Sequence, residues 1–306
     1  MRRGVALGVA VVTAAAVLTL ASAPPASADS DWAVRNRNYE GLADLSGLFT
    51  HGSDGCPDIV WRFHSNPPWT IPSSQDGELW VDIGNCTRNG EMLFGGRYQI
   101  GAGWDGYTIA GFGDWDGDGY PNIVARDSNG NLWLYFYEAA RGFTDPRVQI
   151  GNDWNGYTFA GIADWDRDGN LDIVAKDFWG YLWLYPGEGV SGYSSQQRVQ
   201  IGNGWNGYTF AGITDWDNDG NQDIVARDSN GYLWLYPGEG VRGYSSQQRV
   251  RIGNGWNGYT FAGIGDWDRD LHQDIVARDG NGSLWLYPGE SVRGYSSQPR
   301  VLLEFY

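Results

Sequence analysis

The segment DWDNDGNQD at residues 215–223 belongs to a nine-residue pattern that occurs four times along the chain. The other copies are DWDGDGYPN at 114–122, DWDRDGNLD at 164–172 and DWDRDLHQD at 266–274. Their first residues are 50, 51 and 51 positions apart, which indicates repeated units of about the same length. The function is therefore expected to depend on the array of repeated units and not on one catalytic residue.

These four acidic loops carry the oxygen ligands that a hard cation prefers. Carboxylates at positions 1, 3, 5 and 9 can converge on one ion if the backbone turns sharply near position 6, where Gly119, Gly169 and Gly220 stand. The residue at position 7 would add a backbone carbonyl oxygen. An EF-hand is excluded because Ala125, Ala175 and Ala226 occupy the place of its bidentate glutamate at position 12.

The pattern predicts about four bound calcium ions, although an Asp-rich segment with glycine can also be a plain turn. The predicted ligands are Asp114, Asp116, Asp118, Tyr120, Asn122, Asp164, Asp166, Asp168, Asn170, Asp172, Asp215, Asp217, Asp219, Asn221, Asp223, Asp266, Asp268, Asp270, His272 and Asp274.

Two of the loops depart from the pattern. Leu271 replaces the position-6 glycine of the 266 loop, and a branched side chain in a left-handed backbone costs about 1 kcal/mol or more. We expect this site to be the weakest of the four. Asn122 replaces the position-9 aspartate of the 114 loop, which keeps an oxygen but removes one negative charge, so we expect a modest loss of affinity there.

The N-terminus reads as a secretory signal peptide over residues 1–28. Arg2 and Arg3 precede an apolar run that ends in small residues suited to cleavage, although an uncleaved membrane anchor has the same apolar run. Nothing later is long and apolar enough to span a bilayer. We expect a secreted, monomeric protein with one domain over residues 29–306.

The charge of the chain is strongly acidic. It has 37 acidic and 21 basic residues and a net charge of −16, so nucleic acid is not an expected partner. Cys56 and Cys86 are the two cysteines, and in an exported chain they most simply form one disulfide; two free buried thiols are the alternative.

Each unit reads as four short strands. In the unit at 201–251 they begin near Tyr208, Asp223, Tyr232 and Gln248, and the SNG turn at 229–231 suggests a two-residue hairpin. Both pleat faces of the middle strands are apolar, which implies sheets covered on both sides, and the LWLY tryptophans are expected in the core. The Ala-Gly pairs of the opening strand would allow strands to crowd near a central axis.

Five such units predict an all-β fold, a β-propeller of five four-stranded blades. A degenerate unit at about 39–98 precedes units at 99–149, 150–200, 201–251 and 252–303. In its altered acidic loop only Asp44, Asp54 and Asp58 remain as candidate ligands, so we expect poor calcium binding there. The disulfide could stabilise this unit in place of an ion.

The GxxDWDxDGxxDIVARD pattern resembles the FG-GAP (VCBS-type) repeats of integrin α-subunit propellers and of secreted bacterial proteins. The resemblance covers nearly the whole chain after the signal peptide and implies structural calcium on loops between strands. The shorter segment RVQIGNGWNGYTF at 198–210 resembles the IGxGGW segments of tachylectin-type five-bladed lectins. That likeness implies sugar sites between blades.

Aromatic residues are the candidates for ligand contact, because sugar rings stack on flat apolar faces while polar neighbours bond the hydroxyls. Blade packing is the alternative role for the same residues. Phe178 and Trp179 replace Ser-Asn at one hairpin turn and form a further contact candidate. The aromatic residues of the W-N/D-G-Y turns are Trp104, Tyr107, Trp154, Tyr157, Trp205, Tyr208, Trp256 and Tyr259.

No catalytic residue is predicted. The three histidines are scattered, and Glu188, Glu239 and Glu290 recur in PGE turns, which favours a structural or repeated binding role over catalysis. The leading hypothesis is a non-enzymatic calcium-binding propeller for an extracellular polysaccharide or glycoconjugate. An enzyme with a site at the propeller funnel, a hydrolase or lyase, and a protein–protein interaction propeller are the alternatives.

Overall fold

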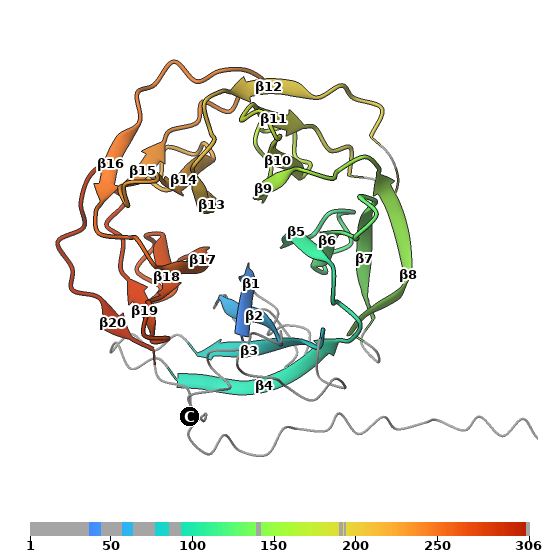
Figure 1. The fold of residues 1–306 in the computed structure, drawn as a ribbon, viewed down its shortest axis with the longest axis horizontal. Helices are drawn as coiled ribbons and strands as arrows, with labels where there is room; N and C mark the ends of the chain where they lie inside the picture. Colours follow the sequence, from blue (N-terminus) through green and yellow to red (C-terminus); the bar gives the residue numbers. More distant parts are fainter. Residues whose placement is uncertain are drawn as a thin grey trace, which may run out of the picture.

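The computed structural model is an all-β ring of five four-stranded antiparallel sheets, set radially around a central axis (Figure 1). It describes residues 37–43, 57–63, 77–85, 93–138, 142–189, 192 and 194–303. Each sheet contains four strands that are consecutive in the sequence, so blade 1 is β1–β4 and blade 5 is β17–β20. The predicted five-bladed propeller is confirmed.

The strands of each blade run in order from the axis to the rim. The innermost strands are β1 (Arg37–Ala43), β5 (Thr108–Gly113), β9 (Thr158–Ala163), β13 (Thr209–Thr214) and β17 (Thr260–Gly265). The second strands are β2 (Asp58–Phe63), β6 (Asn122–Arg126), β10 (Asp172–Lys176), β14 (Asp223–Arg227) and β18 (Asp274–Arg278).

The outer half of each blade is formed by the remaining two strands. The third strands are β3 (Leu79–Asn85), β7 (Leu132–Glu138), β11 (Leu182–Tyr185), β15 (Leu233–Tyr236) and β19 (Leu284–Tyr287). The outermost strands are β4 (Leu93–Gly101), β8 (Gly142–Gly151), β12 (Val199–Gly202), β16 (Val250–Gly253) and β20 (Val301–Leu302).

The hydrophobic core lies between neighbouring blades. In β10, for example, Ile173, Val174 and Ala175 are all buried, because one pleat face packs on the preceding blade and the other on the following blade. The apolar character on both faces thus follows from burial on both faces.

The innermost strands approach one another closely around the axis. A Cβ at Gly111 would lie 2.7 Å from Cγ1 of Ile162 on the next blade, so a larger residue does not fit there without a shift. In β13 the register shifts between Phe210 and Gly212, which leaves Ala211 as the extra residue of a bulge. The small residues allow this crowding, as the sequence predicted.

The ring closes by side-chain packing between blade 5 and blade 1. Ile59 and Trp61 of β2 share a buried cluster with Ala262, Trp267 and Leu286 of blade 5. All four strands of blade 5 come from the C-terminal unit, so no strand of blade 1 completes it.

Two local predictions are wrong. The hairpin after β14 has a three-residue loop, because the Asp228 N–H donates to the Tyr232 carbonyl at 2.9 Å, and Gly231 adopts φ +82°.

The LWLY tryptophans are half-buried rather than in the core: Arg249 lies over the Trp234 ring, 4.0 Å from its centroid. Equivalent arginines cover Trp133, Trp183 and Trp285.

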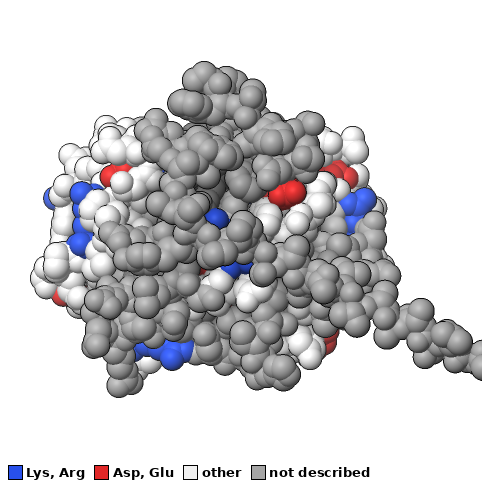
Figure 2. Space-filling view, turned by 90° about the horizontal axis from the view of Figure 1, so that it is seen from below, with Lys and Arg blue, Asp and Glu red and all other residues white. Residues whose placement is uncertain are grey.

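Figure 2 looks onto the rim near β3 and β4, where part of the described surface is visible. Its described Lys, Arg, Asp and Glu residues form small separate groups of both signs. Among the described residues, none belongs to a helix long and apolar enough to cross a membrane.

Candidate functional site

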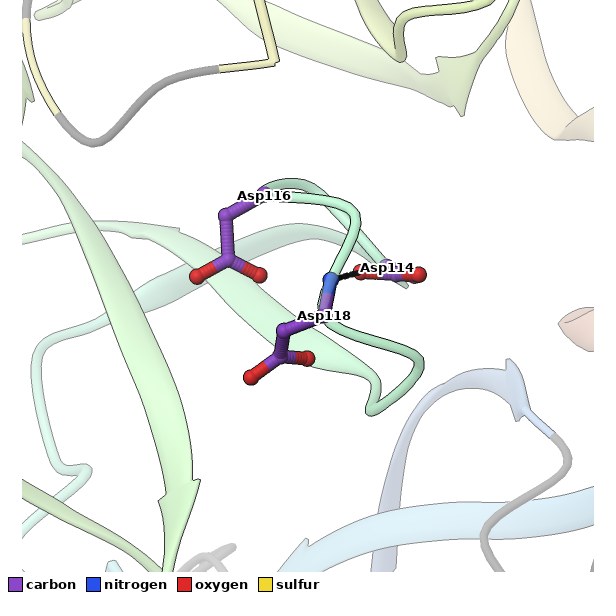
Figure 3. Close-up of side chains that lie close together, drawn as sticks. All are labelled: Asp114, Asp116 and Asp118. Carbon is purple, nitrogen blue, oxygen red and sulfur yellow. Dashed lines mark hydrogen bonds between the residues drawn. The ribbon is translucent and has the colours of Figure 1, made fainter.

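The acidic loops join the innermost strand to the second strand in blades 2 to 5 and bring three carboxylates together in each. In every triad one oxygen per residue lies within 4.8 Å of the others, a spacing that can hold a metal ion. Figure 3 shows the side chains of Asp114, Asp116 and Asp118 close together around the 114 loop, with the hydrogen bond from the Asp118 N–H to Asp114. The triads are Asp114, Asp116 and Asp118; Asp164, Asp166 and Asp172; Asp215, Asp217 and Asp223; and Asp266, Asp268 and Asp274.

Backbone donors hold each loop in shape. In the 164 loop, Asp164 Oδ2 accepts from the Gly169 N–H at 3.1 Å, and Asp168 Oδ1 accepts from the Asn170 N–H at 2.9 Å. One carboxylate oxygen in each loop is nevertheless buried without a hydrogen-bond partner. These oxygens are the Oδ1 atoms of Asp116, Asp164, Asp217 and Asp266. A buried anionic oxygen is costly unless a cation or a donor meets it, so the loops fit a bound cation.

The position-9 aspartates are fully buried at the start of the second strand. Asp172 Oδ2 accepts from the Trp165 N–H at 3.0 Å, and its Oδ1 accepts from the Gly187 N–H at 2.8 Å. Burial is the largest cause that raises the pKa of Asp172 to about 7, and the nearby carboxylate of Asp166 adds to it. Asp223 and Asp274 have the same surroundings, and the pKa of each is also raised to about 7.

This geometry explains the PGE turns, which the sequence analysis considered only for their glutamates. A Cβ at Gly187 would lie 1.9 Å from the Leu171 carbonyl oxygen, so glycine is required where the turn meets the acidic loop. Glu188 accepts from the backbone N–H of Ser195 at 3.0 Å and also bonds the Ser195 hydroxyl. The repeated glutamates therefore brace their own outer loops.

Not every predicted ligand joins its triad. The position-5 aspartate of the 114 loop, Asp118, is part of its triad. The position-5 aspartates Asp168 and Asp219 are not; they pair with arginines of the next blade. At position 7, His272 Nδ1 is buried without a partner and faces no described donor. Position 6 has the predicted left-handed backbone in all four loops, and Leu271 has φ +71°.

Blade 1 has no described triad. Asp58 is buried and accepts from the Gly84 N–H at 2.8 Å, as the other position-9 residues do from their turns. Asp44, Asp54, Cys56 and Cys86 lie outside the described residues, as does the predicted signal peptide at 1–28. The disulfide therefore stays a prediction.

The tryptophans of the W-N/D-G-Y turns pack between blades. Trp104, Trp154, Trp205 and Trp256 are 3 to 7 % exposed. The Trp205 ring lies 4.4 Å from the Tyr236 ring and 5.4 Å from the Phe210 ring, centroid to centroid, so aromatic neighbours cover it. Its partner Tyr208 is half-buried and bonds Arg249 through its hydroxyl. The observed burial of these tryptophans thus agrees with blade packing, which was the alternative to ligand contact.

Cavities nevertheless lie beside three of these tryptophans, at equivalent places between successive blades. The cavity between blades 4 and 5 has about 350 Å³ and is lined by Trp256, Asn254, Tyr295 and Gln298, among others. The cavities between blades 3 and 4 and between blades 2 and 3 have about 250 and 200 Å³ and are lined by Trp205 and Trp154, respectively.

The exposed aromatic groups at two of these cavities come from the GYSS segments, which the sequence analysis did not consider. Tyr244 and Tyr295 are 52 and 46 % exposed. Their hydroxyls accept from Asn203 Nδ2 at 3.3 Å and Asn254 Nδ2 at 3.4 Å, so each cavity has an asparagine from one blade opposite a tyrosine from the next. The recurrence of this tyrosine every 51 residues was the available signal.

Two other candidate regions have simple descriptions. Phe178 and Trp179 are 77 and 73 % exposed on the hairpin between β10 and β11, so this pair is available for contact. The central channel has a cavity of about 230 Å³ whose described lining is alanine, glycine, phenylalanine and isoleucine of β5, β9, β13 and β17.

Comparison with known proteins agrees with the repeat pattern. The family model for the FG-GAP-like repeat matches residues 114–175 and 215–277, which confirms the resemblance to FG-GAP repeats. No curated protein matches the chain.

Two solved structures match the chain at low TM-scores. One is BBS1N in complex with ARL6DN, soaked with lead: 13 % identity, TM-score 0.35, covering 81 % of this chain and 90 % of that one. The other is the extracellular domain of the putative hybrid two component system BT4673 from B. thetaiotaomicron: 15 % identity, TM-score 0.29, covering 79 % of this chain and 30 % of that one.

Proposed function

We propose that this chain is a secreted, calcium-stabilised propeller that binds extracellular glycan and catalyses no reaction. The observation that carries glycan binding is the recurrence of one cavity type between blades, with an asparagine and an exposed tyrosine at two of the three mouths. Tyrosine offers a flat face to a sugar ring, and the asparagine can bond its hydroxyls.

The repetition favours binding over catalysis. Several equivalent weak sites hold a polymer more tightly than one site does, because the second contact is intramolecular once the first has formed. An enzyme needs one distinct set of reactive groups, and the described lining of the central channel offers no ionisable side chain.

Calcium is proposed for the acidic loops because their donors are oxygens and four buried carboxylate oxygens have no other partner. The position-9 carboxylates support this, since a nearby cation would offset the cost of burying their charge. When bound, the ion would tie the innermost strand to the second strand and so stabilise the blade.

Chelation tests the calcium proposal. At a tenfold excess of free calcium over the dissociation constant, each site stabilises by about 1.4 kcal/mol and four by about 6 kcal/mol. At about 2–4 °C per kcal/mol, the melting temperature should rise by about 12–24 °C when calcium replaces chelator. An unchanged melting temperature would contradict a structural role for calcium.

Retention on immobilised polysaccharide, chosen with a glycan array, tests the glycan proposal. Tyr244→Ala with Tyr295→Ala should abolish retention without changing the melting temperature, because both side chains are about half exposed. Tyr232→Ala is the control, since Tyr232 is exposed on a hairpin and lines none of the three cavities.

Trp205→Ala with Trp256→Ala should instead lower stability, by about 3–5 kcal/mol for each buried indole. If the tyrosine double variant is retained as well as wild type, the cavities are not the glycan sites. If the protein binds no glycan on the array, the glycan-binding proposal as a whole is wrong.

A further inference from the structure

Two arginines reach from the outer loop of one blade to the acidic loop of the blade before it. Arg242 of blade 4 pairs with Asp166 and, through Nη2, with Asp168 Oδ2 at 3.0 Å. Arg293 of blade 5 repeats the arrangement on the 215 loop, where its Nη2 lies 3.1 Å from Asp219 Oδ2. Each guanidinium also bonds a glutamine of the preceding outer loop.

The 114 loop differs from these two loops in sequence at both relevant places. Ser191 stands where the repeat has Arg242 and Arg293, and Asn122 stands where it has a position-9 aspartate. The 114 loop therefore has three carboxylates, for a charge of −3. The 164 and 215 loops each have four carboxylates, one of which is offset by the paired guanidinium of Arg242 or Arg293. Arg167 of the 164 loop also reaches the 215 loop, where it bonds the Gly220 carbonyl at 2.9 Å.

We propose that Arg242 and Arg293 are built-in counter-charges that set the cation affinity of the 164 and 215 loops. The inference rests on the proposed calcium function and deepens it. Each guanidinium neutralises one of four carboxylates and repels an incoming divalent ion, so it lowers the affinity of these two sites toward that of the three-carboxylate 114 site. This replaces the expectation that Asn122 alone makes the 114 site weaker than its neighbours.

The unpaired oxygens show that the arginines leave room for an ion. The Asp217 side chain is 6 % exposed, and although its Oδ2 pairs with Arg293, its Oδ1 is buried without a partner. In the 164 loop, Oδ1 of Asp164 is likewise buried without a hydrogen-bond partner. The arginine thus binds one side of the carboxylate cluster and leaves oxygens on the other side for a cation.

The size of the effect follows from Coulomb's law. A guanidinium about 6 Å from a divalent ion reduces the ion's affinity about tenfold even at the dielectric constant of water. The effect is larger at the lower effective dielectric constant of a partly buried site. Salt screens it, so the ionic strength must be fixed in every comparison.

The test is calorimetric titration of the chelator-stripped full chain with calcium ions alone. In Arg242→Ser with Arg293→Ser, two of the four sites should tighten about tenfold, while the other two stay as in wild type. Arg251→Ser is the matched control: Arg251 is on β16, lies over the Tyr232 ring and pairs with no described carboxylate, so its removal changes net charge but should leave all sites unchanged.

Two further variants separate charge from folding. Adding Asp168→Asn and Asp219→Asn to the serine variant removes one negative charge from each loop, which offsets the lost arginine and should restore wild-type affinity. Arg242→Lys with Arg293→Lys keeps the charge and should bind calcium like wild type, which provides a comparison even if the serine variant folds poorly.

The outcomes are distinct. Wild type that binds calcium, with serine variants whose sites are unchanged or weaker, would overturn the counter-charge inference and leave the calcium proposal standing. Lysine variants that bind ten times more tightly than wild type would overturn it as well, because charge would not be the cause. Wild type that takes up no calcium would overturn both.

Discussion

Replacing Leu271 with glycine isolates the strain in the 266 loop. Leu271 has φ +71° at the position where Gly169 has φ +89°, and its side chain is 77 % exposed, so little packing is lost on its removal. Its N–H donates to Asp266 Oδ2 at 3.1 Å and its carbonyl accepts from Asn218 Nδ2 at 3.2 Å. Both are backbone groups that glycine retains, so the substitution changes mainly the backbone strain.

The expected gain is small and positive. Relief of the left-handed strain contributes about 1–2 kcal/mol. The greater freedom of glycine in the unfolded chain removes about 0.4–1 kcal/mol of that gain. The net stabilisation is therefore about 0.5–1 kcal/mol, or about 1–4 °C in melting temperature.

Gly169→Leu is the mirror-image control. A Cβ at Gly169 meets no atom within 4 Å, so a leucine there suffers the backbone strain without a clash. Urea unfolding in chelator should show Leu271→Gly more stable and Gly169→Leu less stable than wild type. In calcium, the 266 loop of Leu271→Gly should also bind its ion more tightly. Without the strain at position 271, the ion-free loop stays in the conformation that binds the ion.

The strain argument fails if Gly169→Leu is as stable as wild type. It also fails if Leu271→Gly is destabilised. A wild-type titration that shows four identical sites would contradict the expectation that the 266 site is the weakest, whatever the two variants do.

Two other predictions concern protons and thiols. Burial raises the pKa of Asp172, Asp223 and Asp274 to about 7, above the value of about 3.9 for an unfolded chain. The folded state thus binds these protons more tightly, so in chelator their contribution to stability is present below about pH 4 and is lost as the pH rises through 7. Calcium should therefore raise the melting temperature more at pH 7.5 than at pH 5, and an equal rise would refute the assignment of position 9 to the cation site. If Cys56 and Cys86 are bonded, reduction should remove about 3 kcal/mol from the first unit, and mass spectrometry that finds two alkylatable thiols in the native protein would rule the bond out.

The repeat architecture could be predicted from the sequence because it depends on local patterns that recur. The DWDxDG loops, the following apolar run and the hairpin turn lie within about 25 residues of one another in each unit. Glycine at position 6 could be assigned to a left-handed backbone from the loop alone, and Leu271 has that backbone as well. Each of these features is set by neighbours in the chain.

The tertiary structure decided which side chains remain available for contact. Nothing local distinguishes Trp205, which aromatic rings cover, from Tyr244, which is half exposed, because the cover comes from packing between blades. The LWLY tryptophans are half-buried for a similar reason: Arg198 and Arg249, each directly before the neighbouring outermost strand, lie over the rings of Trp183 and Trp234.

Contacts between units were likewise beyond the reach of the sequence. Arg242 and Asp166 are 76 residues apart and meet only because the ring sets the outer loop of one blade beside the acidic loop of the blade before it. The sequence by itself therefore determined the repeated fold and the candidate cation ligands. The packing of blade on blade determined the charge around those ligands and the faces open to a partner, because both depend on residues that only the closed ring brings together.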